Sequence, residues 1–241
     1  MNNSPIRTVA ESVDFSGVEC VLIDYFGTQG KSWTIDEAKT VQDLLGHDYV
    51  APEGITDRVD PRLRRLLDTT NVKDLAQFLH LVAGKLGTGP VTTRAIALFD
   101  EMRQRVMCCA GEFKDTAPGL EALKRLGYRL GVMSNLSPFD VEYIFHNHDQ
   151  FHQNFEVLVF SYEVGHVKPE PEIFFKAGEQ VGLPLDKILL VDDEVDNVKA
   201  AKRLGMKAVL IDRWGKVKET IPGVPKIRLL TDLADLLPQR K

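Results

Sequence analysis

Four stretches of the sequence end on polar residues whose types could handle a phosphate group. The apolar run Val21–Ile23 leads into Asp24, a carboxylate able to act as a nucleophile. The remaining polar residues come in groups after a turn or another apolar run: Thr28; Ser134 and Asn135; Lys168; and Asp192, Asp193 and Asn197. A carboxylate, hydroxyl and amide donors, an ammonium group and a second acidic cluster would together form a phosphate site with room for a hard cation.

These groups can meet only if parallel strands carry them to one edge of a sheet. The sequence predicts five strands, over Val18–Asp24, Tyr128–Met133, Val157–Ser161, Ile188–Val191 and Lys207–Ile211. Helical patterns separate them, over Leu120–Leu126, Pro138–His148, Glu170–Val181 and Asn197–Leu204, with a last short helix at Leu230–Leu237. Alternating strands and helices indicate an α/β fold with a doubly wound parallel sheet, whose strand ends converge on one crevice.

The segment between the first and second strands has a different pattern. Its apolar residues recur at spacings of three and four and predict helices over Ile35–Leu45, Pro61–Leu67, Val72–Leu86 and Val91–Met107. We expect an inserted helical cap domain, residues 30–111, that closes over Asp24. The α/β core would then comprise residues 1–29 and 112–241.

Composition narrows the function classes further. The 241 residues are 44% hydrophobic and carry a net charge of −5, enough apolar material for a sizeable core. The pI near 5.7 gives no electrostatic footprint for nucleic acid or an anionic membrane. We therefore expect a small-molecule substrate, no nucleic acid and no membrane partner, and the sequence leaves a homodimer open.

The cysteines and the first residues indicate a compartment. Cys20, Cys108 and Cys109 match neither a disulfide framework nor a zinc spacing, which favours a reducing cytoplasm. Residues 1–17 are polar and contain no apolar run long enough for a signal peptide or a membrane span. We expect a cytoplasmic protein.

Four motifs in order carry a family resemblance. They are Asp24-Tyr25-Phe26-Gly27-Thr28, Ser134-Asn135, Lys168-Pro169, and Asp192-Asp193 continuing to Asn197. With them, the sequence resembles the haloacid dehalogenase-like (HAD) hydrolase superfamily, in its subgroup with a helical cap inserted after the first motif. The similarity extends over about Val18 to Arg213, apart from the cap.

The resemblance implies a role for each phosphate-handling residue. Asp24 would attack the substrate and form a covalent aspartyl intermediate. Ser134 would donate to a phosphoryl oxygen, with Asn135 nearby, and Lys168 would neutralise the nucleophile and the developing charge. Thr28 would help to hold the first motif and the phosphate.

The resemblance also implies a magnesium site. Mg²⁺ would be bound by Asp24, by the main-chain carbonyl of Phe26 and by Asp193, an all-oxygen ligand set completed by water. Asp192 and Asn197 would orient and support that cluster.

Phe26 departs from the pattern of the family's phosphatases. In those enzymes the residue two positions after the nucleophile is a second aspartate, which protonates the leaving alcohol and then activates water. A phenyl ring can do neither, and losing a general acid/base costs about 10²- to 10⁴-fold in rate. The Phe26 carbonyl remains available to a cation.

Three functions stay open on this sequence. The first is a magnesium-dependent phosphatase or phosphotransferase acting on a small phosphorylated metabolite. The second is a 2-haloacid dehalogenase-type hydrolase, because those members resemble this pattern with an aromatic residue at position 26. Asp192, Asp193 and Asn197 oppose it, as does the lack of arginine between Lys31 and Ile55. The third is a catalytically weak member that binds a phosphate ligand.

Overall fold

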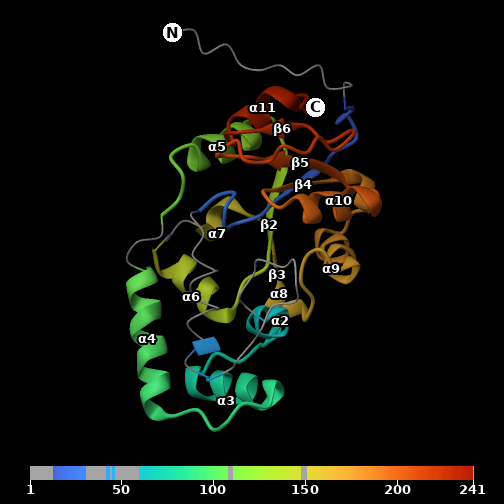
Figure 1. Ribbon diagram of the computed structural model, residues 1–241. Helices are drawn as coiled ribbons and strands as arrows, with labels where there is room; N and C mark the ends of the chain where they lie inside the picture. The colour runs from blue at the N-terminus through green and yellow to red at the C-terminus, as the bar shows by residue number, and fades with distance from the viewer. Residues whose placement is uncertain are drawn as a thin grey trace.

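A six-stranded parallel sheet forms the centre of the protein, seen in a computed structural model that describes residues 13–30, 42–43, 45–46, 60–107, 111–147 and 151–240. The strand order is β3-β2-β1-β4-β5-β6 (Figure 1). The strands are β1 (Cys20–Ile23), β2 (Arg129–Ser134), β3 (Val157–Phe160), β4 (Ile188–Asp192), β5 (Lys207–Ile211) and β6 (Lys226–Ile227). The predicted α/β fold with a doubly wound parallel sheet is confirmed. The sequence does not predict β6, because two residues form no recognisable apolar run.

Helices cover both faces of this sheet. One face packs against α5 (Thr116–Arg125), α6 (Pro138–Asn147) and α11 (Asp232–Leu236). The other packs against α9 (Pro171–Val181) and α10 (Val195–Arg203). Two short helices, α7 (Phe151–Asn154) and α8 (Ser161–Val164), connect the elements around β3. Burial on both faces explains why β1, β3 and β4 consist almost entirely of apolar residues.

Strand β1 occupies the middle of the sheet and sets the position of the first motif. All four of its residues are buried, and it pairs with both β2 and β4. Ile23 lies between Val132 and Val191 in the register. The next residue, Asp24, therefore comes out beside the ends of both neighbouring strands.

Helix α5 begins earlier than the sequence predicts. The pattern favours a turn at Thr116–Gly119 and a helix from Leu120, but the helix begins at Thr116. Pro118 fits the first helical turn, where its missing N–H would have had no partner. Gly119 serves close packing, since a Cβ there would lie 2.9 Å from the Leu230 Cγ.

The segment inserted after β1 contains α2 (Pro61–Thr69), α3 (Leu75–Leu86) and α4 (Thr93–Met107). Asp60 and Asp74 begin α2 and α3 as N-caps, each accepting a hydrogen bond from a backbone N–H inside its helix. The three helices share an apolar cluster of their own, which Phe139 of α6 joins. The helix predicted over Ile35–Leu45 lies mostly outside the described residues, as do Cys108 and Cys109.

The two crossings between the sheet and these helices lie side by side. Gly30 forms an antiparallel bridge with Glu112, and the Phe113 N–H donates to the Gln29 carbonyl at 2.9 Å. Thr116 Oγ1 donates to that same carbonyl at 2.8 Å. The chain thus leaves and re-enters the sheet-bearing part at one place.

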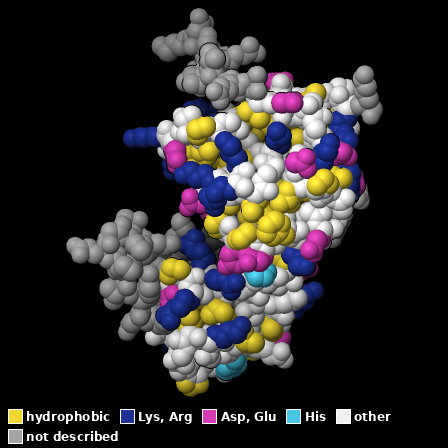
Figure 2. Space-filling view, turned by 90° about the vertical axis from the view of Figure 1, so that its right-hand side faces the viewer, with side chains coloured by type: hydrophobic (Ala, Val, Ile, Leu, Met, Phe, Trp, Pro, Cys, Tyr) yellow, Lys and Arg dark blue, Asp and Glu magenta, His cyan; other side chains and the backbone are white. Residues whose placement is uncertain are grey.

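The surface shows no dominant sign of charge on the face drawn in Figure 2, where basic and acidic side chains are interspersed. Among the described residues, no helix combines the length and the apolar character needed to cross a membrane.

Candidate active site

Asp24 lies buried at the carboxyl end of β1 and is held by residues from two other motifs. Ser134 Oγ donates to its Oδ1 at 2.8 Å, and Lys168 Nζ donates to the same oxygen at 2.6 Å. Burial raises the pKa of Asp24 to about 7; Lys168 opposes this shift and Asp192 adds to it. Among the described residues, the side chains that donate to Asp24 both bind Oδ1, and none donates to Oδ2.

The ammonium group of Lys168 joins two carboxylates inside the protein. Its Nζ contacts Asp24, Asp192 Oδ2 at 2.6 Å and the Met133 carbonyl at 2.9 Å, which uses all three donors. Burial alone would lower the pKa of Lys168, but Asp192 and Asp24 outweigh it and raise that pKa above its ordinary value. Lys168 is therefore a permanent positive charge beside the nucleophile.

Asn135 holds the backbone of Lys168 in place. Its Oδ1 accepts from the Lys168 N–H at 2.7 Å, and its Nδ2 donates to the Lys168 carbonyl at 2.9 Å. The side-chain amide is thus engaged on both sides. This geometry shows a positioning contact for Asn135, and its predicted contact with phosphate stays a prediction.

The two aspartates of the fourth motif, Asp192 and Asp193, have different surroundings. Asp192 Oδ2 binds Lys168, while Oδ1 accepts from the Glu194 N–H at 2.9 Å and from Asn197 Nδ2 at 3.0 Å. Asp192 therefore connects Lys168 to Asn197, and the supporting role predicted for Asp192 and Asn197 stays a prediction. Burial, then the charges of Asp24 and Asp192, raise the pKa of Asp193 to about 8.

The turn after β1 is shaped to receive Asp193. Gly27 has φ of +81°, and a Cβ at this position would lie 2.1 Å from Asp193 Oδ2. Only glycine both adopts that conformation readily and leaves the space. Thr28 is fully buried, and its hydroxyl lies 3.4 Å from Asp193 Oδ1, so it holds the acidic cluster. Its predicted contact with phosphate stays a prediction.

Arg213, which the sequence does not predict as part of the site, contacts the backbone of this turn. Its Nε donates to the Thr28 carbonyl at 2.8 Å, and its Nη1 pairs with Asp115 at 2.9 Å. The guanidinium group also lies over the Phe113 ring, 4.0 Å from its centre. Asp115 lies 98 residues and Thr28 lies 185 residues before Arg213 in the sequence, so no local pattern could reveal these contacts.

A pocket of about 310 Å³ opens in front of Asp24 and collects most of the predicted residues. Its lining includes Asp24, Phe26, Ser134, Asn135, Lys168, Asp192, Asp193 and Asn197. Thr28 does not line it. The opposite wall comes from the α2–α4 segment, which contributes Pro61, Arg64, Arg65, Leu67, Asp68, Phe78 and Phe99. The sequence indicates helices there but not which of their side chains face the site.

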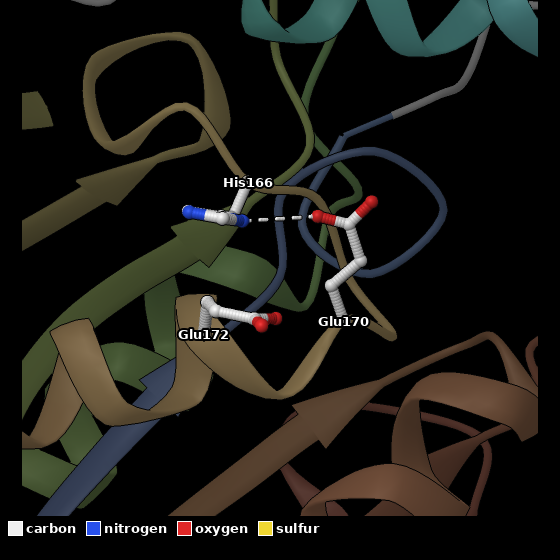
Figure 3. A group of neighbouring side chains, drawn as sticks. All are labelled: His166, Glu170 and Glu172. Atoms are coloured by element: carbon white, nitrogen blue, oxygen red, sulfur yellow. Dashed lines mark hydrogen bonds and ion pairs between the residues drawn. The ribbon is translucent and has the colours of Figure 1, made fainter.

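A second acidic group near the pocket resembles a metal site in composition. His166, Glu170 and Glu172 offer ligand atoms within 4.8 Å of one another, and Figure 3 shows the His166 ring and the Glu170 carboxylate turned toward each other. Yet both Glu170 oxygens already accept from Arg65, at 2.8 and 3.2 Å. A cation would have to displace that guanidinium group. The contact instead ties α2 to the loop that carries Lys168.

Comparison with known proteins gives relatives of two activities. The chain is 27% identical to phosphatase MT3486 of Mycobacterium tuberculosis over 68% of its own length and 70% of that protein. It is 26% identical to an (S)-2-haloacid dehalogenase of Pseudomonas putida over 61% of its length and 66% of that enzyme. In fold it is similar to the crystal structure of a HAD phosphatase from Thermococcus onnurineus, with a TM-score of 0.61 at 24% identity, over 92% of this chain and 99% of that one.

The sequence model of the haloacid dehalogenase-like hydrolases matches residues 36–205. That range holds the second, third and fourth motifs, whose side chains surround Asp24 in the pocket. The family match and the geometry thus agree on one site. The chain belongs to the haloacid dehalogenase-like hydrolase family.

Proposed function

We propose that this protein is a magnesium-dependent phosphatase that hydrolyses a small phosphorylated metabolite through an aspartyl intermediate on Asp24. One observation carries the proposal. The Asp24 carboxylate has its Oδ1 fixed by Ser134 and Lys168, while its Oδ2 is left for attack at the floor of a pocket. A volume of about 310 Å³ suits a small metabolite.

In this mechanism Asp24 attacks the phosphorus, and the P–O bond to the alcohol breaks. Lys168 lies beside the attacking carboxylate and stabilises the negative charge on the transferring phosphoryl group. Ser134, now bonded to Asp24, is placed to donate to a phosphoryl oxygen once substrate is bound. Water then attacks the aspartyl phosphate and restores the Asp24 carboxylate.

The residues at the acidic end of the pocket fit Mg²⁺. Asp24, Asp193 and the Phe26 carbonyl supply oxygen ligands, the kind that this ion prefers. The Gly27 turn leaves a space that a Cβ would fill beside Asp193. Burial and, after it, the charge of Asp24 raise the pKa of Asp193, and a bound cation would relieve that repulsion. When bound, Mg²⁺ would neutralise phosphoryl charge as a Lewis acid.

We further propose that residues 30–111 form a cap and that residues 1–29 and 112–241 form the core. The α2–α4 helices have their own apolar cluster, and the pocket lies between them and the strand ends. The adjacent crossings at Gly30 and Glu112 would act as the hinge. Closure would exclude water from the site.

A second candidate function, dehalogenation, is favoured by Phe26, because a halide leaves without a proton. The pocket also contains Arg64 and Arg65, so the lack of arginine between Lys31 and Ile55 does not deprive the site of a cationic cap residue. Against it stand Asp192, bound to Lys168, and Asp193 behind the turn. Those carboxylates suit a cation better than a metal-independent site.

Hydrolysis of p-nitrophenyl phosphate tests the proposal. Its leaving group is a weak base and scarcely needs a proton donor. We expect turnover that requires Mg²⁺ and is abolished in Asp24→Asn, while the exposed Asp186→Asn serves as the matched control.

Turnover that survives Asp24→Asn would overturn the covalent mechanism. If neither protein turns over the ester, release of chloride from 2-chloropropionate in EDTA would support the dehalogenase. The absence of both activities, with phosphate still bound, would leave the binding protein.

A further inference from the structure

Hydrolysis of a phosphate ester in this pocket needs a proton donor for the leaving oxygen, on the side that faces Asp24. In-line displacement places the leaving oxygen opposite the attacking carboxylate. We infer that this side is the wall formed by α2–α4, which lines the same pocket as Asp24. Phe26, on the Asp24 side, has no proton to give.

The described residues of that wall include three polar side chains, Arg64, Arg65 and Asp68. An arginine cannot release its proton in a protein. Arg65 is in addition bound to both oxygens of Glu170. Among the described residues from α2–α4 that line the pocket, Asp68 is therefore the one carboxyl group.

Two further carboxyl groups act on Asp68 through their charge, Glu194 before α10 and Asp140 on the first turn of α6. Glu194 Oε2 accepts from Asn197 Nδ2 at 3.3 Å. Asp140 Oδ2 accepts from both the N–H and the hydroxyl of Ser137, each at 2.7 Å. Two donors on one oxygen favour the ionised form. Asp140 is thus a poor proton donor, although its charge acts on Asp68.

The backbone of Asp68 is tied to the loop that follows Ser134. Ser161 Oγ lies 2.7 Å from the Asp68 carbonyl and accepts from the Leu136 N–H at 3.0 Å. Leu136 follows Ser134 by two positions, and Ser134 contacts Asp24. Two hydrogen bonds therefore fix the last turn of α2 relative to the segment after Ser134, the residue that contacts the nucleophile Asp24.

The surroundings of Asp68 keep its carboxyl group protonated. Burial and the charge of Asp140 raise the pKa of Asp68 to about 8; Glu194, which begins α10, adds to the shift, and Arg64 on α2 itself opposes it. At neutral pH the group holds a proton that it can give up.

We propose that Asp68 is the general acid and base of this site. As the Asp24–phosphorus bond forms and the bond to the leaving oxygen breaks, Asp68 donates its proton to that oxygen. The resulting carboxylate then takes a proton from the water that attacks the aspartyl phosphate, and Asp24 leaves. This inference rests on the proposed phosphatase function. It extends the substrates to phosphate esters of alcohols with a high pKa, which leave only when they are protonated.

A pair of substrates matched in size tests this role. Phenyl phosphate and p-nitrophenyl phosphate occupy similar volumes, but phenolate needs protonation far more than p-nitrophenolate. We expect Asp68→Asn to lower kcat/KM for phenyl phosphate by about 10²-fold and for p-nitrophenyl phosphate by less than about threefold. Asparagine resembles the protonated acid in shape and charge, so circular dichroism should show an unchanged fold. Asp74→Asn, an N-cap of α3 outside the pocket, is the matched control.

The pH dependence supplies a second readout. The wild type should lose activity on phenyl phosphate above about pH 8, as the acid ionises. Asp68→Glu should keep that alkaline limb at a reduced rate, and Asp68→Asn should lose it.

Equal losses on both substrates, or no loss on either, would overturn the acid role and leave the phosphatase standing. So would a wild type that hydrolyses only p-nitrophenyl phosphate. A wild type that hydrolyses neither ester would instead overturn the phosphatase itself.

Discussion

Lys168 is the residue whose removal should disturb the site most. It lies between two carboxylates, and only 1% of its side chain is exposed. Breaking a buried ion pair on one side costs about 3–5 kcal/mol, because a charge is left without a partner. We predict that Lys168→Met lowers the free energy of unfolding by about that amount at pH 7.5, measured by urea denaturation.

Lys176→Met provides the matched control. Lys176 pairs with Glu179 at 2.7 Å, but half of its side chain is exposed. Such surface pairs contribute about 0–1 kcal/mol. Equal losses in the two variants would show that the Lys168 contacts contribute no more than a surface pair.

Substitution of Phe26 can restore a carboxylic acid at the position where the first motif of the family's phosphatases carries one. The ring lines the pocket and packs edge-on against Tyr25, with centres 5.2 Å apart. In the Asp68→Asn background, Phe26→Asp should raise the rate on phenyl phosphate by about tenfold or more, since a carboxyl group again reaches the pocket. Steady-state kinetics would measure it. Phe26→Asn, of the same shape without an acid, should give no such gain, and equal gains in both would contradict the prediction.

At the scale of elements, Arg65 and Glu170 connect α2 to the loop between α8 and α9. Their guanidinium and carboxylate groups meet through two hydrogen bonds at 2.8 and 3.2 Å. If α2–α4 close over the substrate, this contact favours the closed form. We predict that Arg65→Gln raises KM for p-nitrophenyl phosphate by about two- to fivefold, as expected for an exposed pair.

High salt should also raise the KM of the wild type for p-nitrophenyl phosphate, because exposed ion pairs are screened at high ionic strength. The difference between the wild type and Arg65→Gln should therefore shrink at high salt. Arg129→Gln, which removes an exposed pair with Glu156 at 3.0 Å outside the pocket lining, is the control. An identical rise in KM for Arg129→Gln would contradict a role in closure.

The sequence predicts those parts of the site that follow strands. Asp24, Ser134 and Asp192 each come at the end of an apolar run, and parallel strand ends must converge. The wall opposite them could not be predicted. Helical periodicity shows that residues 61–69 form a helix, but the pocket side of α2 carries both Arg65 and Asp68, which look like solvated residues in the sequence.

Contacts that are distant in sequence were equally hidden. The residues around Arg213 and those around Asp115 show no sequence pattern that predicts their ion pair. Yet Arg213 holds the turn after β1, and Asp115 is the N-cap of α5. The same pairing explains why α5 starts without a side-chain cap from Asp115, since that carboxylate faces Arg213 and the Leu230 N–H. Long-range ion pairs of this kind appear only in three dimensions.

For the whole molecule, the acidic site opposes folding. Folding raises the pKa of Asp24 to about 7 and the pKa values of Asp68 and Asp193 to about 8, with burial the largest cause in each. In the unfolded chain these carboxyl groups ionise near pH 4. Between about pH 4 and pH 8 the folded state therefore holds more protons, and the free energy of unfolding falls as the pH rises. The pKa values of Asp115 and Glu170 shift downward instead, so their stabilisation is lost only in acid.

Magnesium should reverse most of this decline, because it binds the ionised forms of Asp24 and Asp193. We predict that in EDTA the Tm falls by several °C between about pH 5.5 and pH 8, given that 1 kcal/mol corresponds to about 2–4 °C in a protein of this size. With millimolar MgCl₂ the fall should be smaller, and the gain from Mg²⁺ largest at pH 8, as scanning calorimetry would measure. Asp193→Asn should flatten the decline in EDTA and abolish the response to Mg²⁺. A Tm that rises toward pH 8 in EDTA would mean that these carboxylates are already ionised in the folded protein, with Lys168 outweighing their burial.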